Sequence, residues 1–362
     1  MFKNNNLLNN SFYSVLGTVL AGFFGYVLSF ILSRQLTVVQ FGEYQFFASV
    51  FVILGIVSAG LTYFVVKHTA VLAEINDYQA NYLFINKIFK KISWPLAGFF
   101  ILLLILALFF SCLKFYNLSA LMVVCLSVVL SMVGSIYLGM FIGWQDFKRF
   151  ALVNTLANLI RLLVPVLVWF YPSVVIATLS FFFYGLGTFV FGYWFSRKKW
   201  FKPELKLAQP ITQNIITLEK RAMVSALLLS ALTLVIGNGD ILLIKYFFSA
   251  EVVGQYSVLA LLGRMPFFIS IAIIAVFLPK FCLAVNLADK KNEKQLFRRS
   301  YLFIGLINIF FIVFYYFFST FILALSFGQN YVILSRELWL VAVMYLFFSL
   351  IVLKANQLFV KY

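Results

Sequence analysis

The chain has 362 residues, of which 64% are hydrophobic, 20% are aromatic and only 11% are charged, and its formal net charge at pH 7 is +17. Ordinary soluble domains are about 45–50% apolar and about 25% charged, so this composition excludes a soluble enzyme, a disordered protein and a secreted disulfide scaffold. The basic residues stand in short runs between apolar stretches and form no single patch, which argues against nucleic acid as a partner. The class that remains is an integral α-helical membrane protein.

Apolar stretches long enough to cross a bilayer follow one another along the whole sequence. A bilayer core about 30 Å thick is crossed by about 20 apolar residues of helix. The stretches that reach this length predict about ten membrane helices, in an all-α polytopic fold. They cover approximately residues 11–33, 44–66, 93–113, 118–142, 150–170, 173–195, 222–247, 253–278, 301–325 and 338–360. The first stretch is expected to stay in the membrane, because no small-residue cleavage site follows it.

Lysine and arginine are distributed very unequally between the two sides that these helices separate. Of the 28 basic residues, 21 fall on the side of the N-terminus and four fall inside the spans. Only Arg34, Lys114 and Arg336 fall on the opposite side, where the loops are short. By the positive-inside rule, both termini are expected to be cytoplasmic. Function is therefore expected within the helix bundle or on the cytoplasmic loops.

The residues that build metal sites and disulfides are few and scattered. The sequence has three cysteines, Cys112, Cys125 and Cys282, and one histidine, His68. All three cysteines lie in or beside apolar segments, as small packing residues do. We therefore expect neither a metal site nor a disulfide framework, and no cofactor.

Two turns with similar sequences suggest an internal repeat. Gly42 and Tyr44 match Gly254 and Tyr256 at the same offset of 212 residues. The two turns are six helices apart, and because six is even the two halves would have the same orientation in the membrane. The alternative is chance similarity between two turns.

Four short motifs follow one another in a recognisable order. They are Arg-x-Leu-Thr-x-x-x-Phe-Gly-x-Tyr over 34–44, Gly143-Trp-Gln145 with Asn154, the segment 240–256, and Phe-Gly-Gln-Asn-Tyr over 327–331. In their order and spacing they resemble bacterial O-antigen and polysaccharide flippases of the multidrug/oligosaccharidyl-lipid/polysaccharide (MOP) exporter superfamily. The resemblance covers essentially the whole chain.

The resemblance implies a two-lobed bundle. Residues 1–196 would form an N-terminal lobe of six helices, and residues 222–362 a C-terminal lobe of four. Family members usually have twelve or more helices, so the second lobe is expected to be incomplete, in either a short member or a truncated chain. The link 197–221 mixes basic and apolar residues, a composition typical of an interfacial helix on anionic lipid headgroups.

One acidic residue lies inside a predicted span, where a charge costs about 2.5–3.5 kcal/mol and needs a partner or water. This is Asp240, at the end of the cluster Gly237–Asp240, whose glycines are expected to loosen the helix. One interpretation makes Asp240, with Asn238, a site that couples transport to H⁺ or Na⁺. The other is a structural salt bridge to Lys245 or Arg264, or simply a position near the external interface.

Cations and amides inside the spans are candidate contacts for an anionic substrate. Asn154, Asn158 and Arg161 follow at i, i+4 and i+7, and form either a cavity lining or an interhelical hydrogen-bond ladder. The planar guanidinium of Arg264 suits diphosphate oxygens, although it could instead be a static partner of Asp240. Two further candidates for a headgroup site are Lys245 and Arg34, the latter of which could also snorkel to the surface.

The resemblance implies a flippase, and not an enzyme, in the bacterial inner membrane. Its substrate would be an oligosaccharide linked to undecaprenyl diphosphate, moved from the cytoplasmic to the periplasmic leaflet by alternating access. The anionic headgroup fits the excess of cations over acids inside the spans. One alternative is an O-antigen polymerase, a membrane glycosyltransferase, although the short external loops argue against it. The other is a multidrug exporter of the same superfamily.

Overall fold

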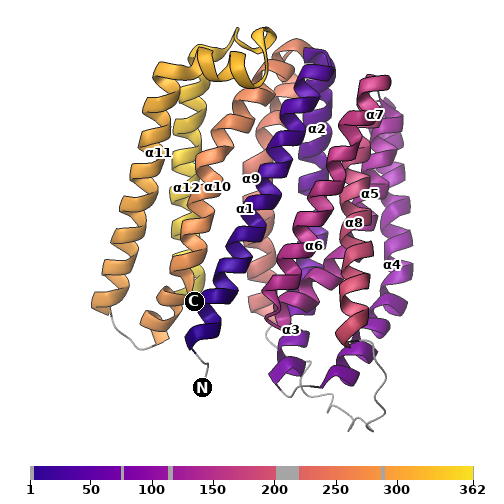
Figure 1. Ribbon diagram of the computed structural model, residues 1–362, viewed down its shortest axis with the longest axis vertical. Coiled ribbons are helices and arrows are strands. Elements are labelled where there is room, and N and C mark those ends of the chain that lie inside the picture. The colour runs from indigo at the N-terminus through magenta and orange to yellow at the C-terminus, as the bar shows by residue number, and fades with distance from the viewer. Residues whose placement is uncertain (1–3, 75–76, 113–116, 201–219, 287–289, 362) are drawn as a thin grey trace. The chain divides into compact units, whose positions relative to one another are not determined.

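The structure is a computed structural model that describes residues 4–74, 77–112, 117–200, 220–286 and 290–361 (Figure 1). Within these ranges the chain forms helices and turns and no strand. The elements are α1 (Asn4–Gln35), α2 (Val38–Leu54), α3 (Ile56–Glu74), α4 (Tyr78–Cys112), α5 (Leu118–Gly143), α6 (Phe147–Ile160), the 3-10 turn η1 (Arg161–Leu163), α7 (Val164–Phe170), α8 (Val174–Trp200), α9 (Lys220–Phe247), α10 (Ala250–Asn286), α11 (Lys290–Ser326), the 3-10 turns η3 (Gln329–Tyr331) and η4 (Ser335–Glu337), and α12 (Leu338–Lys361).

The predicted all-α membrane architecture is confirmed. Among the described residues, eight stretches of helix are long and apolar enough to cross a membrane. The remaining two predicted spans coincide with α4 and α9, which have 35 and 28 residues. Several helices are longer than predicted, since α4 begins at Tyr78 and α10 continues to Asn286. The extension of α4 carries Lys87, Lys90 and Lys91, and a hydropathy criterion detects only the apolar part of such a helix.

Two of the spans are interrupted, which the sequence analysis did not predict. The span Val38–Ala73 is divided between α2 and α3 at Gly55. The span Phe147–Phe170 tightens into η1 between α6 and α7. Pro165 explains this second break, because proline has no backbone N–H and its ring clashes with the carbonyl four residues earlier, which belongs to Arg161. The backbone N–H of Val164 instead donates to Arg161 O, as in a 3-10 turn.

The chain divides into two units with separate internal packing. Unit 1 comprises 1–35 and 47–234, and unit 2 comprises 36–46 and 235–362. The link 197–221 begins within α8, which ends at Trp200, and its residues 201–219 lie outside the part of the chain that the structure describes. The lobes at 1–196 and 222–362 therefore remain a prediction.

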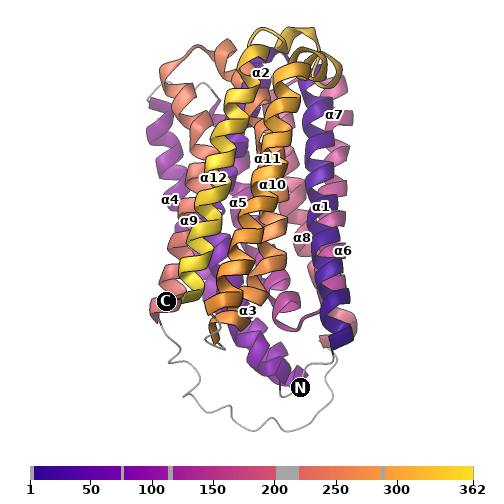
Figure 2. The same ribbon diagram turned by 90° about the vertical axis from the view of Figure 1, so that its left-hand side faces the viewer.

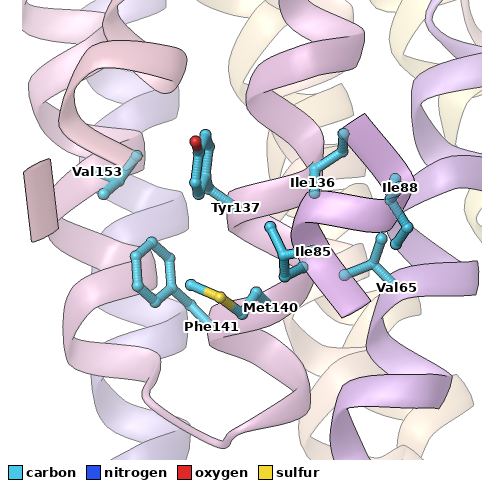
Figure 3. Close-up of a cluster of buried hydrophobic side chains, with 8 residues drawn as sticks. All are labelled: Val65, Ile85, Ile88, Ile136, Tyr137, Met140, Phe141 and Val153. Carbon is cyan, nitrogen blue, oxygen red and sulfur yellow. The ribbon is translucent and has the colours of Figure 1, made fainter. Parts of the chain in front are cut away.

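Unit 1 is organised around α5. This helix packs against α3, α4 and α8, and α6 packs against α1 and α8. Small residues allow the closest approaches: a Cβ atom on Gly192 of α8 would lie only 2.7 Å from Cβ of Tyr137 on α5. Tyr137 belongs to a cluster of buried side chains from α3, α4, α5 and α6 (Figure 3). The members of the cluster are Val65, Ile85, Ile88, Ile136, Tyr137, Met140, Phe141 and Val153.

Unit 2 is built on α10, α11 and α12, which pack side by side (Figure 2). The segment 36–46, which includes the start of α2, also belongs to this unit. Its Phe41 ring lies 5.9 Å from the ring of Tyr331 in η3, and both side chains are buried. Burial raises the pKa of the Tyr331 phenol above its ordinary value, so it stays neutral at physiological pH.

The two glycines of the suggested repeat contact each other within unit 2. A Cβ atom on Gly42 would lie 2.7 Å from N and 2.8 Å from Cα of Gly254. A Cβ atom on Gly254 would overlap the carbonyl oxygen of Val38. Glycine is therefore required at both positions because two backbones meet there, a reason that turn chemistry alone does not supply.

Candidate functional site

Asp240 and Arg264 form a buried ion pair in unit 2. Nη2 of Arg264 on α10 donates to Oδ1 of Asp240 on α9, at 2.8 Å. The two side chains are 12% and 11% exposed. Of the two partners that the sequence analysis offered for Asp240, the structure therefore selects Arg264.

Two tyrosines complete the network. The Tyr256 hydroxyl, on α10, donates to Oδ2 of Asp240 at 3.0 Å. The Tyr345 hydroxyl, on α12, accepts from Nε of Arg264 at 2.7 Å. It also lies 3.2 Å from Oδ2 of Asp240 and 3.3 Å from the Gly237 carbonyl oxygen, and its single proton can be donated to one of them at a time. Three helices thus converge on one carboxylate.

The local sequence explains why these helices meet here. Tyr256 and Arg264 are eight residues apart, slightly more than two helical turns, so both can reach Asp240 from α10. Gly237 precedes Asp240 by nearly one turn, and a Cβ atom there would lie 3.3 Å from the Phe348 ring. Its lack of a side chain leaves room for the Phe348 ring of α12. α9 is helical without a break from Gly237 to Asp240, and the expectation that the glycines loosen it stays a prediction.

Burial makes this pair hard to break. Removing one partner of a buried ion pair typically costs about 3–5 kcal/mol, because the other charge is left without compensation in a low dielectric. Here the tyrosine hydroxyls add hydrogen bonds to both charged groups. The arrangement can hold one positive and one negative charge inside the membrane as a neutral unit.

The second candidate site lies in unit 1, at the break between α6 and α7. Nη1 of Arg161 donates to Oδ1 of Asn158 at 3.0 Å, and Nδ2 of Asn158 donates to the Asn154 carbonyl oxygen at 2.9 Å. The guanidinium also lies 5.8 Å from the ring centroid of Phe181 and 5.7 Å from that of Tyr184, both on α8. The polar stripe read from the sequence is thus one connected chain of hydrogen bonds beside aromatic rings.

Arg161 differs from Arg264 in its partners. Within the described ranges Arg161 forms no salt bridge, and its Nε is buried without a hydrogen-bond acceptor. A buried donor of a charged group normally has an acceptor, so this atom marks a place where an additional acceptor would be favourable.

The other predicted site residues lie away from these two centres. Lys245, in the last turn of α9, is 3.8 Å from Glu43 and does not contact Asp240. Arg34 is exposed in the last turn of α1, where a cation favourably opposes the helix dipole. Asn238 stands two residues before Asp240, a spacing that places the two side chains on different faces of α9. Tyr256 stands out in the sequence as part of the repeat, but not as a hydrogen-bond partner of Asp240. Nothing in the sequence pointed to Tyr345 as a second partner.

Metal ligands do not gather in any part of the chain that the structure describes. Groups of three or more His, Cys, Asp or Glu residues in a geometry suited to a metal ion are not found there. The site in unit 1 consists of arginine, amide and aromatic groups, and the site in unit 2 consists of arginine, two phenols and one carboxylate. Such groups suit the recognition of an anion by hydrogen bonds and charge.

The helical fold, with charged groups held inside its spans, defines a multi-pass membrane protein. The structure is similar to the inward-facing conformation of a multidrug resistance MATE family transporter of the MOP superfamily, with a TM-score of 0.70 and 11% identity over 96% of this chain and 84% of that one. It is also similar to MATE in the straight conformation, with a TM-score of 0.66 and 11% identity over 98% and 82% of the two chains. A third similar structure is a MOP superfamily transporter from Pyrococcus furiosus, with a TM-score of 0.60 and 12% identity over 98% and 84%.

The family follows from the sequence itself. Residues 7–283 match the polysaccharide biosynthesis protein family, and the chain belongs to this family. No curated protein matches the chain. The predicted relationship to polysaccharide biosynthesis proteins is thereby confirmed, and the fold is similar to that of MOP superfamily transporters.

Proposed function

We propose that the protein is a flippase for lipid-linked oligosaccharides. Membership of a polysaccharide biosynthesis family supports a saccharide substrate, and the fold is that of MOP transporters. The specific substrate in this proposal is an oligosaccharide on undecaprenyl diphosphate, which moves with its diphosphate from the cytoplasmic to the periplasmic leaflet of the inner membrane. Both termini are cytoplasmic in this proposal, as the positive-inside rule predicts.

The observation that carries the proposal is the environment of Arg161. A cation inside a membrane span is costly, and this one has aromatic and amide neighbours but no salt bridge within the described ranges. A diphosphate brings several anionic oxygens, which can accept from the unsatisfied Nε and form charge-assisted hydrogen bonds. Asn154 and Asn158 hold the guanidinium in position for this contact.

Coupling to an ion gradient belongs to the same proposal. Asp240 is the candidate group, and H⁺ or Na⁺ is the candidate ion. Because Arg264 already neutralises this carboxylate, a coupling cation has to replace Arg264 as its partner. Coupling at Asp240 therefore requires that the ion pair opens during transport.

The test is glycan export in a flippase-deficient strain that produces this chain. Arg161→Gln is expected to reduce export by at least about tenfold, since loss of a charged hydrogen-bond partner typically costs about 1.5–3 kcal/mol. Arg336→Gln is the matched control, because Arg336 is exposed in the 3-10 turn η4 that precedes α12. Normal export by Arg161→Gln would refute the proposed role of this site.

The same strain separates the alternatives. If lipid-linked repeat units accumulate when the strain does not produce this protein, flipping is supported. If the protein instead exports cationic dyes and no such accumulation occurs without it, a multidrug exporter is favoured. Formation of long polymer chains from units already in the periplasm would favour a polymerase. The positive charge at Arg161 is better suited to an anionic headgroup than to a cationic drug.

A further inference from the structure

The ion pair in unit 2 has a geometry that leaves Arg264 partly uncommitted. Only Nη2 of Arg264 donates to Asp240, and only to Oδ1, so the contact is made through a single hydrogen bond. Arginine and carboxylate are frequently paired through two parallel hydrogen bonds, which is the stronger arrangement. The second oxygen of Asp240 is occupied by tyrosine hydroxyls instead.

We propose that Asp240 is an internal counter-anion that occupies Arg264 until a diphosphate headgroup replaces it. In this exchange Arg264 changes partner from one carboxylate oxygen to the oxygens of a diphosphate. This inference rests on the proposed function and adds Arg264 to it as a second anion-binding group. We call the contact of Asp240 with Arg264 the latch, because it has to open before an anion can bind Arg264.

The structure provides for the carboxylate after the exchange. Tyr256 donates to Oδ2 at 3.0 Å, and Tyr345 lies 3.2 Å from the same atom. When Arg264 leaves, the Tyr345 hydroxyl no longer accepts from Nε and remains available to donate to Asp240. The carboxylate therefore keeps two hydroxyl donors, which lowers the cost of separating the pair.

The latch also explains why the two arginines inside the spans have different surroundings. Among the residues that the structure describes, Arg161 contacts amide and aromatic side chains and forms no salt bridge, so an anion meets no competing carboxylate from them there. At Arg264 the anion has to displace Asp240 first. A weakly charged ligand cannot do so, whereas a diphosphate with two or more negative charges competes effectively. The latch would in this way favour diphosphate lipids over lipids with less charge.

The test measures the affinity of the full chain, in lipid nanodiscs, for farnesyl diphosphate. Asp240→Asn keeps the shape of the side chain but removes the competing charge, and it is expected to lower the Kd about tenfold, which corresponds to about 1.4 kcal/mol. Asp146→Asn is the matched control, because Asp146 also pairs with an arginine, Arg149, at 2.7 Å but lies outside the network. Its Kd is expected to change less than twofold.

Two more variants keep the test decisive. Asp240→Ser also removes the competing charge, with a smaller side chain, so a similar fall in Kd is expected even if Asp240→Asn does not fold. The double variant with Asp240→Asn and Arg264→Gln is expected to lose the gain in affinity. Size-exclusion profiles and melting temperatures establish that each protein is folded.

The possible results are distinct. The latch is overturned if folded Asp240→Asn, or Asp240→Ser where the former does not fold, binds farnesyl diphosphate no more tightly than the wild type. It is equally overturned if the double variant keeps the higher affinity, because the lipid would then bind elsewhere. Either result leaves the flippase proposal standing, since that proposal is tested separately by export through Arg161→Gln. Loss of export in Arg161→Gln, together with tighter binding of farnesyl diphosphate by Asp240→Asn, supports both the flippase proposal and the latch.

Discussion

Gly42→Ala tests whether the contact between the two repeated turns is as close as the structure indicates. The added Cβ atom would lie 2.7 Å from N and 2.8 Å from Cα of Gly254, and 3.2 Å from the carbonyl carbon of Val253. All three are backbone atoms, so no side chain can rotate away. Ordinary contact begins near 3.4 Å, and the two segments have to separate by roughly 0.7 Å.

This separation sets the expected magnitude. Overpacking of a well-packed interior costs about 1–3 kcal/mol, against a gain of about 0.5–1 kcal/mol for replacing glycine by alanine inside a helix. We therefore expect a net destabilisation of about 1–2 kcal/mol for Gly42→Ala. Gly254→Ala should be more destabilising, because its Cβ atom would overlap the carbonyl oxygen of Val38.

Thermal unfolding of the purified protein in detergent, followed by tryptophan fluorescence, measures the effect. Gly305→Ala is the matched control, since Gly305 is also helical and its added Cβ atom meets nothing within 4 Å. The control is expected to melt at the same temperature as the wild type or slightly higher. If Gly42→Ala melts together with Gly305→Ala, the close contact of the two glycines is refuted.

Two further substitutions probe the ion pairs in unit 2 by the same measurement. Arg264→Gln should destabilise the protein by about 3–5 kcal/mol, because Asp240 stays buried without its counter-charge, and adding Asp240→Asn should recover part of that loss. No recovery in the double variant would mean that the charges do not compensate each other. Lys245→Met should cost less than about 1 kcal/mol, because its contact with Glu43 is 3.8 Å long and both side chains are 20% exposed. A loss as large as that of Arg264→Gln would contradict this difference.

The sequence was sufficient for the fold but only partly for the site. Hydropathy identifies membrane helices because each must bury its own backbone polar groups and expose apolar side chains to lipid. It could not reveal η1, because the hydropathy of the span is the same whether or not Pro165 forces a tighter turn. The stripe of Asn154, Asn158 and Arg161 was predictable because helical spacing alone places the three on one face.

Long-range partners were not predictable in the same way. Asp240 had two candidate cations, and the nearer in sequence, Lys245, was the wrong one. Five residues along a helix turn a side chain away from its predecessor, whereas Arg264 returns to Asp240 from the next helix. Tyr345 gave no signal because a tyrosine among apolar residues is common in membrane helices, and only the packing of α12 against α10 shows that its hydroxyl is used.

The two arginines inside the spans, Arg161 and Arg264, raise the same energetic question. A charged side chain inside a span costs about 2.5–3.5 kcal/mol, and a glutamine could make the hydrogen bond that Arg161 makes to Asn158 without that cost. Neither the aromatic rings nor the amides require a positive charge, so packing does not explain why the residue is arginine. At Arg264 the charge is matched by Asp240, and a pair of neutral residues could replace both at no loss of stability. In each unit it is therefore the positive charge that has to be explained. Binding of the anionic substrate proposed above would explain it. Glutamine at either position removes the charge and keeps a hydrogen-bonding group, so an unchanged export rate in both variants would leave the two charges without that explanation.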